Sequence, residues 1–154
     1  MVDEGAGWSL LSELISVSDL DRSVSFYQDV MSIQELRRDD QVAALGRKET
    51  GSPIIYLIQA SAHAVRRGGQ GSLGLRTFSC NVGSLAELDH VQERLETFGA
   101  FRDRQVFSEA SKVEMVRGYD PDRLPVNFVA YQTGNPIEPD DYFRAASLMY
   151  SVDV

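Results

Sequence analysis

The sequence predicts an α+β protein made of two βαβββ units that follow one another along the chain. Two segments have the pattern of a short strand leading into a capped amphipathic helix, and three strand-like segments follow each of them. The halves also match weakly: residues 17–20 match 82–85 at an offset of 65, and residues 53–56 match 125–128 at an offset of 72. Such a repeated order of elements indicates a duplicated unit.

The first unit is expected over residues 8–60. Residues 10–17 are apolar with partial alternation, which predicts a strand. Ser18 is expected to cap the next helix, with Asp21 three residues later, and apolar residues then recur at helical spacing. Three short strands are expected to complete the unit, over residues 33–37, 42–45 and 53–58.

A linker over residues 61–72 is expected to lead into a second unit over residues 73–133. Its first strand is predicted at 73–82, and the S-x-x-E pattern of residues 84–87 predicts the start of a helix that ends near Gly99. The remaining strands are expected at residues 101–106, 112–117 and 126–131. Residues 134–154 form a tail with apolar positions, which we expect to pack on the body of the protein or on a partner chain.

Composition excludes several classes of protein. The 154 residues include 15 Lys and Arg against 23 Asp and Glu, a net charge of −8. A surface this acidic repels phosphate backbones, so no nucleic-acid partner is expected. The single cysteine forms no intrachain disulfide, the N-terminus is acidic, and no apolar stretch approaches the ~20 residues of a membrane helix. We therefore expect a cytoplasmic protein without a membrane partner.

Residues 17–30, VSDLDRSVSFYQDV, resemble the opening strand-to-helix signature of the vicinal oxygen chelate superfamily. This superfamily groups glyoxalases, bleomycin-resistance proteins and extradiol dioxygenases. Residues 118–122 with 125–128 resemble its closing turn and strand, so the resemblance covers about residues 10–131. It implies two modules with mixed sheets around a concave cleft, paired within one chain or swapped between chains, and a homodimer.

The resemblance also implies where a metal would bind. In metal-binding members, a His lies on the first strand of each unit and a Glu on the last. The matching positions here are Ser12, Ile55, Thr77 and Asn127. Divalent metals require anionic oxygen or imidazole ligands, which these residues do not supply. We therefore expect no metal ligands at these positions and no cofactor.

Strand alternation predicts which other residues line the cleft. The predicted ligand-binding residues are Ser12, Leu57, Gln59, Arg76, Thr77, Ser79 and Asn127. Alternation adds Leu14, Ser16, Ile55, Asn81 and Val129, and Arg117 is a second arginine able to bind a carboxylate or phenolate oxygen. Apolar walls with a few hydrogen-bonding groups suit a small organic ligand. The polar groups could equally fill the space by bonding to one another or to water.

Three functions remain open at this stage. The favoured interpretation is a small-molecule-binding protein that works without metal, as bleomycin-resistance proteins sequester ligands. The second is a metal-independent enzyme (an isomerase, lyase or ring-opening enzyme) that acts on a small aromatic or polyketide-like substrate, with Glu114 as general base. The third is a non-catalytic partner or scaffold. A metal-dependent dioxygenase or lyase fits only if the predicted ligand register is wrong.

Overall fold

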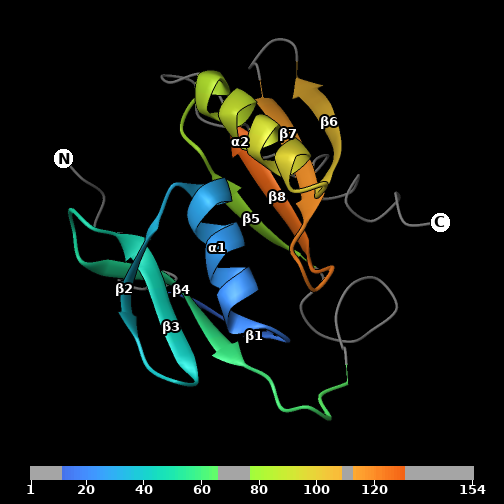
Figure 1. Cartoon of the computed structure of the whole chain (residues 1–154). Coiled ribbons are helices and arrows are strands. Elements are labelled where there is room, and N and C mark those ends of the chain that lie inside the picture. Colours follow the sequence, from blue (N-terminus) through green and yellow to red (C-terminus); the bar gives the residue numbers. More distant parts are fainter. Residues whose placement is uncertain (1–11, 66–76, 109–112, 131–154) are drawn as a thin grey trace, which may run out of the picture. The chain divides into compact units, whose positions relative to one another are not determined.

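The computed structural model describes residues 12–65, 77–108 and 113–130 of the chain. Two compact units follow one another, the first ending at Ala62 and the second beginning at His63 (Figure 1). The first unit contains β1 (Glu13–Val17), α1 (Leu20–Met31), β2 (Gln34–Arg38), β3 (Val42–Arg47) and β4 (Ser52–Gln59). The second contains β5 (Phe78–Asn81), α2 (Leu85–Thr97), β6 (Phe101–Ser108), β7 (Val113–Tyr119) and β8 (Pro125–Ala130).

Each unit forms one four-stranded mixed sheet. The strand orders are β1-β4-β3-β2 and β5-β8-β7-β6, so the first and last strands of each unit are neighbours. These neighbours, β1 with β4 and β5 with β8, are parallel, while the other pairs are antiparallel. The predicted α+β fold with two βαβββ units is confirmed. The predicted tail lies outside the described residues.

The two helices begin at different kinds of cap. Ser84 caps α2 as predicted, since its hydroxyl accepts the backbone N–H of Glu87 at 3.1 Å. The cap predicted at Ser18 is wrong by one residue, because Asp19 caps α1 and accepts the N–H of Arg22 at 2.9 Å. Asp19 has the extended backbone of an N-cap, whereas the Ser18 hydroxyl accepts instead from the Arg22 side chain.

In the second unit, α2 covers one face of the sheet. Leu88, Val91 and Leu95 of α2 are buried. A Cβ added at Gly118 would lie 2.7 Å from the carbonyl oxygen of Ala100 and 3.0 Å from a methyl group of Leu95, so this position on β7 faces the helix. Because side chains alternate along a strand, Glu114 also faces α2, and Met115, Arg117 and Tyr119 face away from it.

In the first unit, α1 covers the face that carries Ile15 and Val17. These two residues are buried, whereas Leu14 between them is 67% exposed. Gln59 lies on the buried face, since it is paired in register with Val17, and its side chain accepts the N–H of Leu20 in α1. Each sheet therefore has one face under a helix and one face that points away from it.

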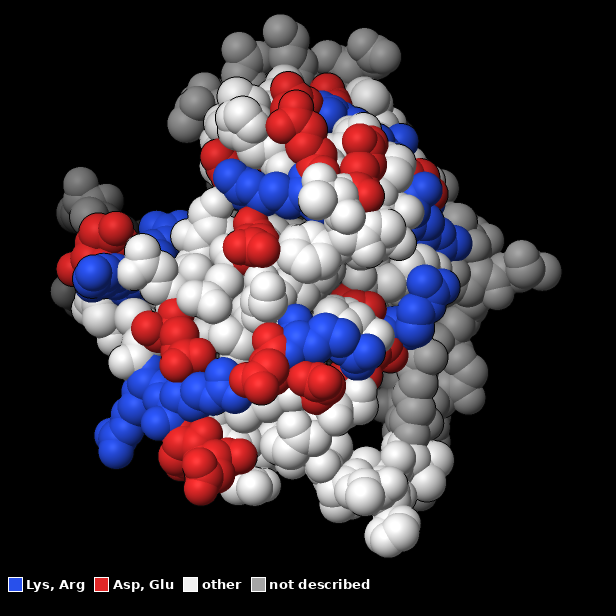
Figure 2. All heavy atoms as spheres, viewed as in Figure 1, with Lys and Arg blue, Asp and Glu red and all other residues white. Residues whose placement is uncertain are grey.

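Charged side chains lie side by side over the helix-covered side of the second unit (Figure 2). Arg94 pairs with Glu87 within α2, and Arg104 pairs with Asp89 of α2 from β6. The described parts of the chain contain no helix long and apolar enough to cross a membrane.

The β2–β3 turn should weaken in acid through Asp39. The pKa of Asp39 is lowered because its carboxylate accepts the backbone N–H groups of Gln41 and Val42, each at 2.8 Å. A carboxyl group whose pKa is lower in the folded state than in the unfolded chain stabilises the fold. This stabilisation is fully present above the pKa of the unfolded chain and is lost as pH falls through the pKa of the folded state. Asp39→Asn should therefore lower the melting temperature at neutral pH and flatten its fall in acid, measured by thermal melts from pH 7 to pH 2. Asp40→Asn is the matched control; an equal effect of the two variants would contradict this account.

Candidate functional site

Four polar residues form a row across the face of the second sheet that points away from α2. Ser79 on β5 pairs with Asn127 on β8, Asn127 pairs with Arg117 on β7, and Arg117 pairs with Asp103 on β6. Directly opposed residues of neighbouring strands project from the same face of a sheet. We call Ser79, Asn127, Arg117 and Asp103 the polar row.

A hydroxyl next to the row fixes the orientation of the Asn127 amide. The Thr77 Oγ1 atom lies 2.9 Å from the carbonyl oxygen of Pro125 and 2.8 Å from Nδ2 of Asn127. Since a carbonyl only accepts, the single hydroxyl hydrogen goes to Pro125, and Asn127 Nδ2 must donate to Thr77. The side-chain oxygen of Asn127 therefore points away from Thr77. Asn127 as a whole is buried, with 3% of its surface exposed.

The cation of the row is neutralised by its neighbour. Arg117 Nε donates to Asp103 Oδ1 at 2.6 Å, and Nη2 donates to Oδ2, which makes a two-pronged ion pair. The Arg117 side chain is 5% exposed and that of Asp103 is 34% exposed. A guanidinium this deeply buried would be costly without a partner, so Asp103 is what makes the position tolerable.

The next row on the same face is more apolar. It contains Asn81, Val129, Met115 and Gln105, in register across the four strands. Met115 is 0% exposed and Val129 is 9% exposed. The face thus combines buried apolar side chains with amide and hydroxyl groups, the usual composition of a site for a small organic molecule.

The equivalent row of the first unit has a different chemistry. By register it consists of Leu14 on β1, Tyr56 on β4, Ala44 on β3 and Arg37 on β2. Tyr56 is thus the counterpart of Asn127, and Leu14 the counterpart of Ser79. The sequence interpretation missed Tyr56, because an offset of 72 aligns Ile55 with Asn127 whereas the register gives an offset of 71.

Two predicted ligand-binding residues of the first unit lie on the opposite face from Ser16. Leu57 is paired with Ile15 and is 0% exposed, so it belongs to the core under α1. Gln59 accepts the N–H of Leu20 and donates to the carbonyl of Ser18, both at 2.9 Å, and thereby secures the start of α1. The strand parity assumed for Leu57, Gln59 and Ile55 was therefore wrong.

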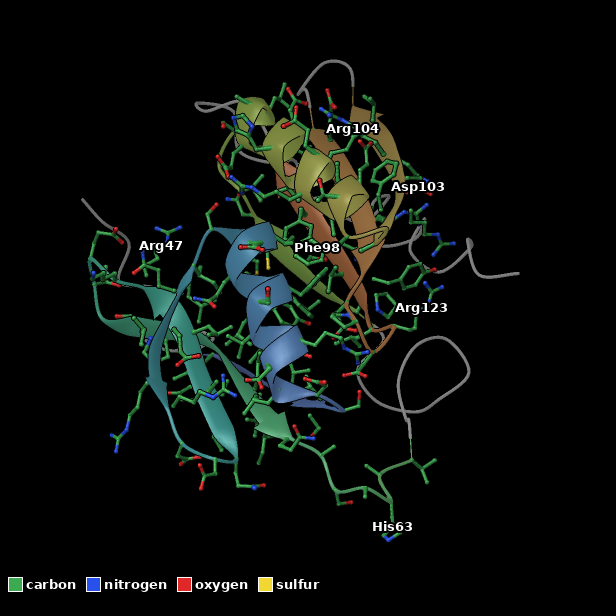
Figure 3. All side chains as sticks on the ribbon, viewed as in Figure 1. Arg47, His63, Phe98, Asp103, Arg104 and Arg123 are labelled. Atoms are coloured by element: carbon green, nitrogen blue, oxygen red, sulfur yellow. The ribbon has the colours of Figure 1, made fainter. Side chains whose placement is uncertain are left out.

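The predicted general base is also on the helix-covered face. Glu114 accepts from Arg104 Nε at 2.7 Å, and Arg104 Nη1 donates to Asp89 and Gln92 of α2. Burial lowers the pKa of Arg104, but hydrogen bonds to Asp89 and Glu114 outweigh it and the net shift is upward. Glu114 therefore ties β7 to β6 and α2 on the face opposite to that of Asn127, and its role as a general base stays a prediction. Figure 3 labels Asp103 and Arg104, chain neighbours on β6 that take part in these two separate pairs.

The residues at the metal positions do not fit a divalent cation. Thr77, Asn127 and Tyr56 offer only neutral oxygen or amide groups, and Thr77 and Asn127 already bond to each other. Over residues 12–65, 77–108 and 113–130, no three His, Cys, Asp or Glu side chains gather as metal ligands would. Ser12 is half-buried just before β1, and a site shared by Ser12, Thr77 and Asn127 stays a prediction. Arg76 lies outside the described residues.

The folds of several solved structures resemble that of this chain. A glyoxylase/bleomycin resistance protein/dioxygenase domain from Frankia sp. EAN1pec has 22% identity and a TM-score of 0.68, with 84% of this chain and 96% of that chain covered. A putative glyoxalase from Bacillus halodurans has 19% identity and a TM-score of 0.64, with 79% and 95% covered. The fosfomycin resistance protein FosX from Listeria monocytogenes, complexed with Mn(II) and sulfate ion, has 14% identity and a TM-score of 0.60, with 84% and 98% covered.

These similarities confirm the fold that the sequence resemblance implied. At 22% identity and below, they establish the arrangement of strands and helices and not the chemistry of the site. No family model and no curated protein matches the chain. The polar row itself therefore carries the functional argument.

Thr77→Val should destabilise the fold, because it removes the acceptor of Asn127 and the donor to Pro125 while keeping the side-chain shape. Leaving buried polar groups unsatisfied costs about 1–3 kcal/mol. Ser79→Ala is the matched control, since its exposed hydroxyl lies 3.5 Å from Asn127 Nδ2, and it should cost less than about 0.5 kcal/mol. Urea unfolding measures both; equal losses of stability would show that Thr77 does not orient Asn127.

Proposed function

We propose that this protein binds a small organic molecule, without a metal ion, on the face of the second sheet that points away from α2. The observation that supports the proposal is the chemistry of the side chains at the positions where metal-binding members of the superfamily have their ligands. Thr77 and Asn127 form a hydrogen-bonded pair of neutral groups there, held by the carbonyl of Pro125. Neutral amides and hydroxyls compete poorly with water for a cation but bond well to the oxygen and nitrogen atoms of organic ligands.

The composition of the face supports this proposal. Asn127 supplies an oriented amide, Ser79 an exposed hydroxyl, and Met115 and Val129 an apolar floor beside them. Ser79 and Asn127 lie opposite each other on neighbouring strands, and the Arg117–Asp103 ion pair lies beside them on the next two strands. A ligand lying along the row would meet hydrogen-bonding groups at fixed intervals, which gives orientation as well as affinity.

The enzyme alternative lacks its expected base. Glu114 bonds to Arg104 on the helix-covered face, so a general base on the polar face would have to be another group. The metal-dependent alternative is favoured by the fold alone, since FosX from Listeria monocytogenes is described with Mn(II). The metal-dependent alternative would require anionic oxygen or imidazole ligands, which Thr77, Asn127 and Tyr56 do not provide.

Asn127→Ala should weaken ligand binding. Native mass spectrometry of protein purified from its own host identifies the ligand, and calorimetric titration measures its affinity for each variant. The loss of one hydrogen bond, at about 1 kcal/mol, corresponds to a roughly fivefold weaker affinity. Glu114→Gln is the matched control on the other face and should leave the affinity unchanged. Metal analysis of the same sample decides the second half of the proposal: one equivalent of Mn, Fe, Ni or Zn bound at Thr77 and Asn127 would overturn it.

We also propose that the protein is a homodimer, as the fold resemblance and the apolar tail suggest. Sedimentation at micromolar concentration should give about twice the chain mass of 17.1 kDa. A species with the mass of one chain would contradict this proposal and would leave the ligand site unaffected.

A further inference from the structure

We propose that Asp103 makes the ligand site selective for uncharged molecules, because its carboxylate occupies the place at Arg117 that the carboxylate of a ligand would take. This inference rests on the proposed function and names the class of ligand: a neutral molecule with amide, hydroxyl or carbonyl groups. Asp103 then acts as a specificity-determining residue of the site.

The geometry of the pair is that of a guanidinium binding a carboxylate ligand. Arg117 Nε donates to Asp103 Oδ1 and Nη2 donates to Oδ2, so both carboxylate oxygens are bound in parallel. Two parallel N–H···O bonds are the arrangement with which arginine recognises free carboxylates and phosphates. A residue of the neighbouring strand already fills this arrangement, at the high effective concentration of an intramolecular partner.

Burial makes the exchange of Asp103 for an anion unfavourable. The Arg117 side chain is 5% exposed, so an anion would have to enter where the more exposed Asp103 carboxylate now lies. The entering anion would displace the Asp103 carboxylate from Arg117. Asp103 would then have no cationic partner and would lie next to a second negative charge. The other two members of the row, Asn127 and Ser79, are neutral and do not compensate that charge. A neutral ligand avoids this cost, because it leaves the ion pair intact and bonds to the amide and hydroxyl groups.

The protein contains a comparable pair on the opposite face. Arg104 bonds to Glu114, but it also bonds to Asp89 and Gln92 of α2. Removing Glu114 thus leaves Arg104 with other partners, whereas among the described residues the Arg117 guanidinium bonds only to Asp103. Glu114→Ala is therefore a matched control for Asp103→Ala: each removes one carboxylate from an arginine on β6 or β7, but on opposite faces.

The test compares acetate with acetamide, which have similar shape and differ in charge. Full-length wild-type protein, Asp103→Ala and Glu114→Ala are titrated with each probe at constant ionic strength. Two readouts are followed: the melting temperature, and the NMR signal of the Arg117 Nε–H group. We expect acetate to raise the melting temperature of Asp103→Ala and to shift the Arg117 signal saturably, with an affinity at least about tenfold above that for the wild-type protein. Acetamide carries no charge and should leave the Arg117 signal unshifted in all three proteins, and Glu114→Ala should respond to acetate as the wild type does.

The proposal is overturned if acetate binds Arg117 equally well in the wild-type protein and in Asp103→Ala, or if it binds Arg117 in neither. Asp103→Asn serves as a second variant should Asp103→Ala fold poorly, since it keeps the side-chain volume and removes the charge; the same increase in acetate affinity is expected. Acetate and acetamide do not depend on the identity of the natural ligand. A search that finds no natural ligand would therefore contradict the proposed function, but the acetate titration would still test the role of Asp103.

Discussion

The register between β7 and β8 determines the chemistry of the second unit, because it sets Arg117 directly opposite Asn127. Pairing with β5 and β6 then adds Ser79 and Asp103 at the two ends of the same row. A slip of one residue would turn these side chains toward α2 and bring Val116 and Phe128 to the other face. The apolar residues under α2 thus hold the polar row in place, although they do not belong to it.

The sequence predicted the fold well because its signals are local. The S-x-x-E cap at Ser84, the helical spacing of apolar residues and the left-handed Gly99 after α2 each act within a few residues. Alternation also placed Ser79, Asn127 and Val129 on one face of the second sheet, and the register confirms that they share it.

The first unit was harder to predict, since β4 is apolar on both faces. Ile54 to Ile58 is an uninterrupted apolar run around Tyr56, so alternation alone does not show which residues turn toward the helix. Leu57 and Gln59 were therefore assigned to the wrong face, and Tyr56 was missed. The surroundings of Glu114 were not predicted for a different reason. Glu114 bonds to Arg104 of β6, which also bonds to Asp89 and Gln92 of α2, and no local sequence pattern predicts contacts between separate elements.

The two halves of the duplicated fold have diverged at matching positions. The first unit has Leu14 and Tyr56 where the second has Ser79 and Asn127. Neither pair supplies the anionic or imidazole ligands that a divalent metal requires. The most direct test of a metal-free organic site is a crystal structure of the protein with the ligand it carries from its own host, recorded with anomalous data. Our account predicts organic density within hydrogen-bonding distance of Asn127 or Ser79 and no anomalous peak there; a metal ion coordinated by Thr77 or Asn127 would contradict it.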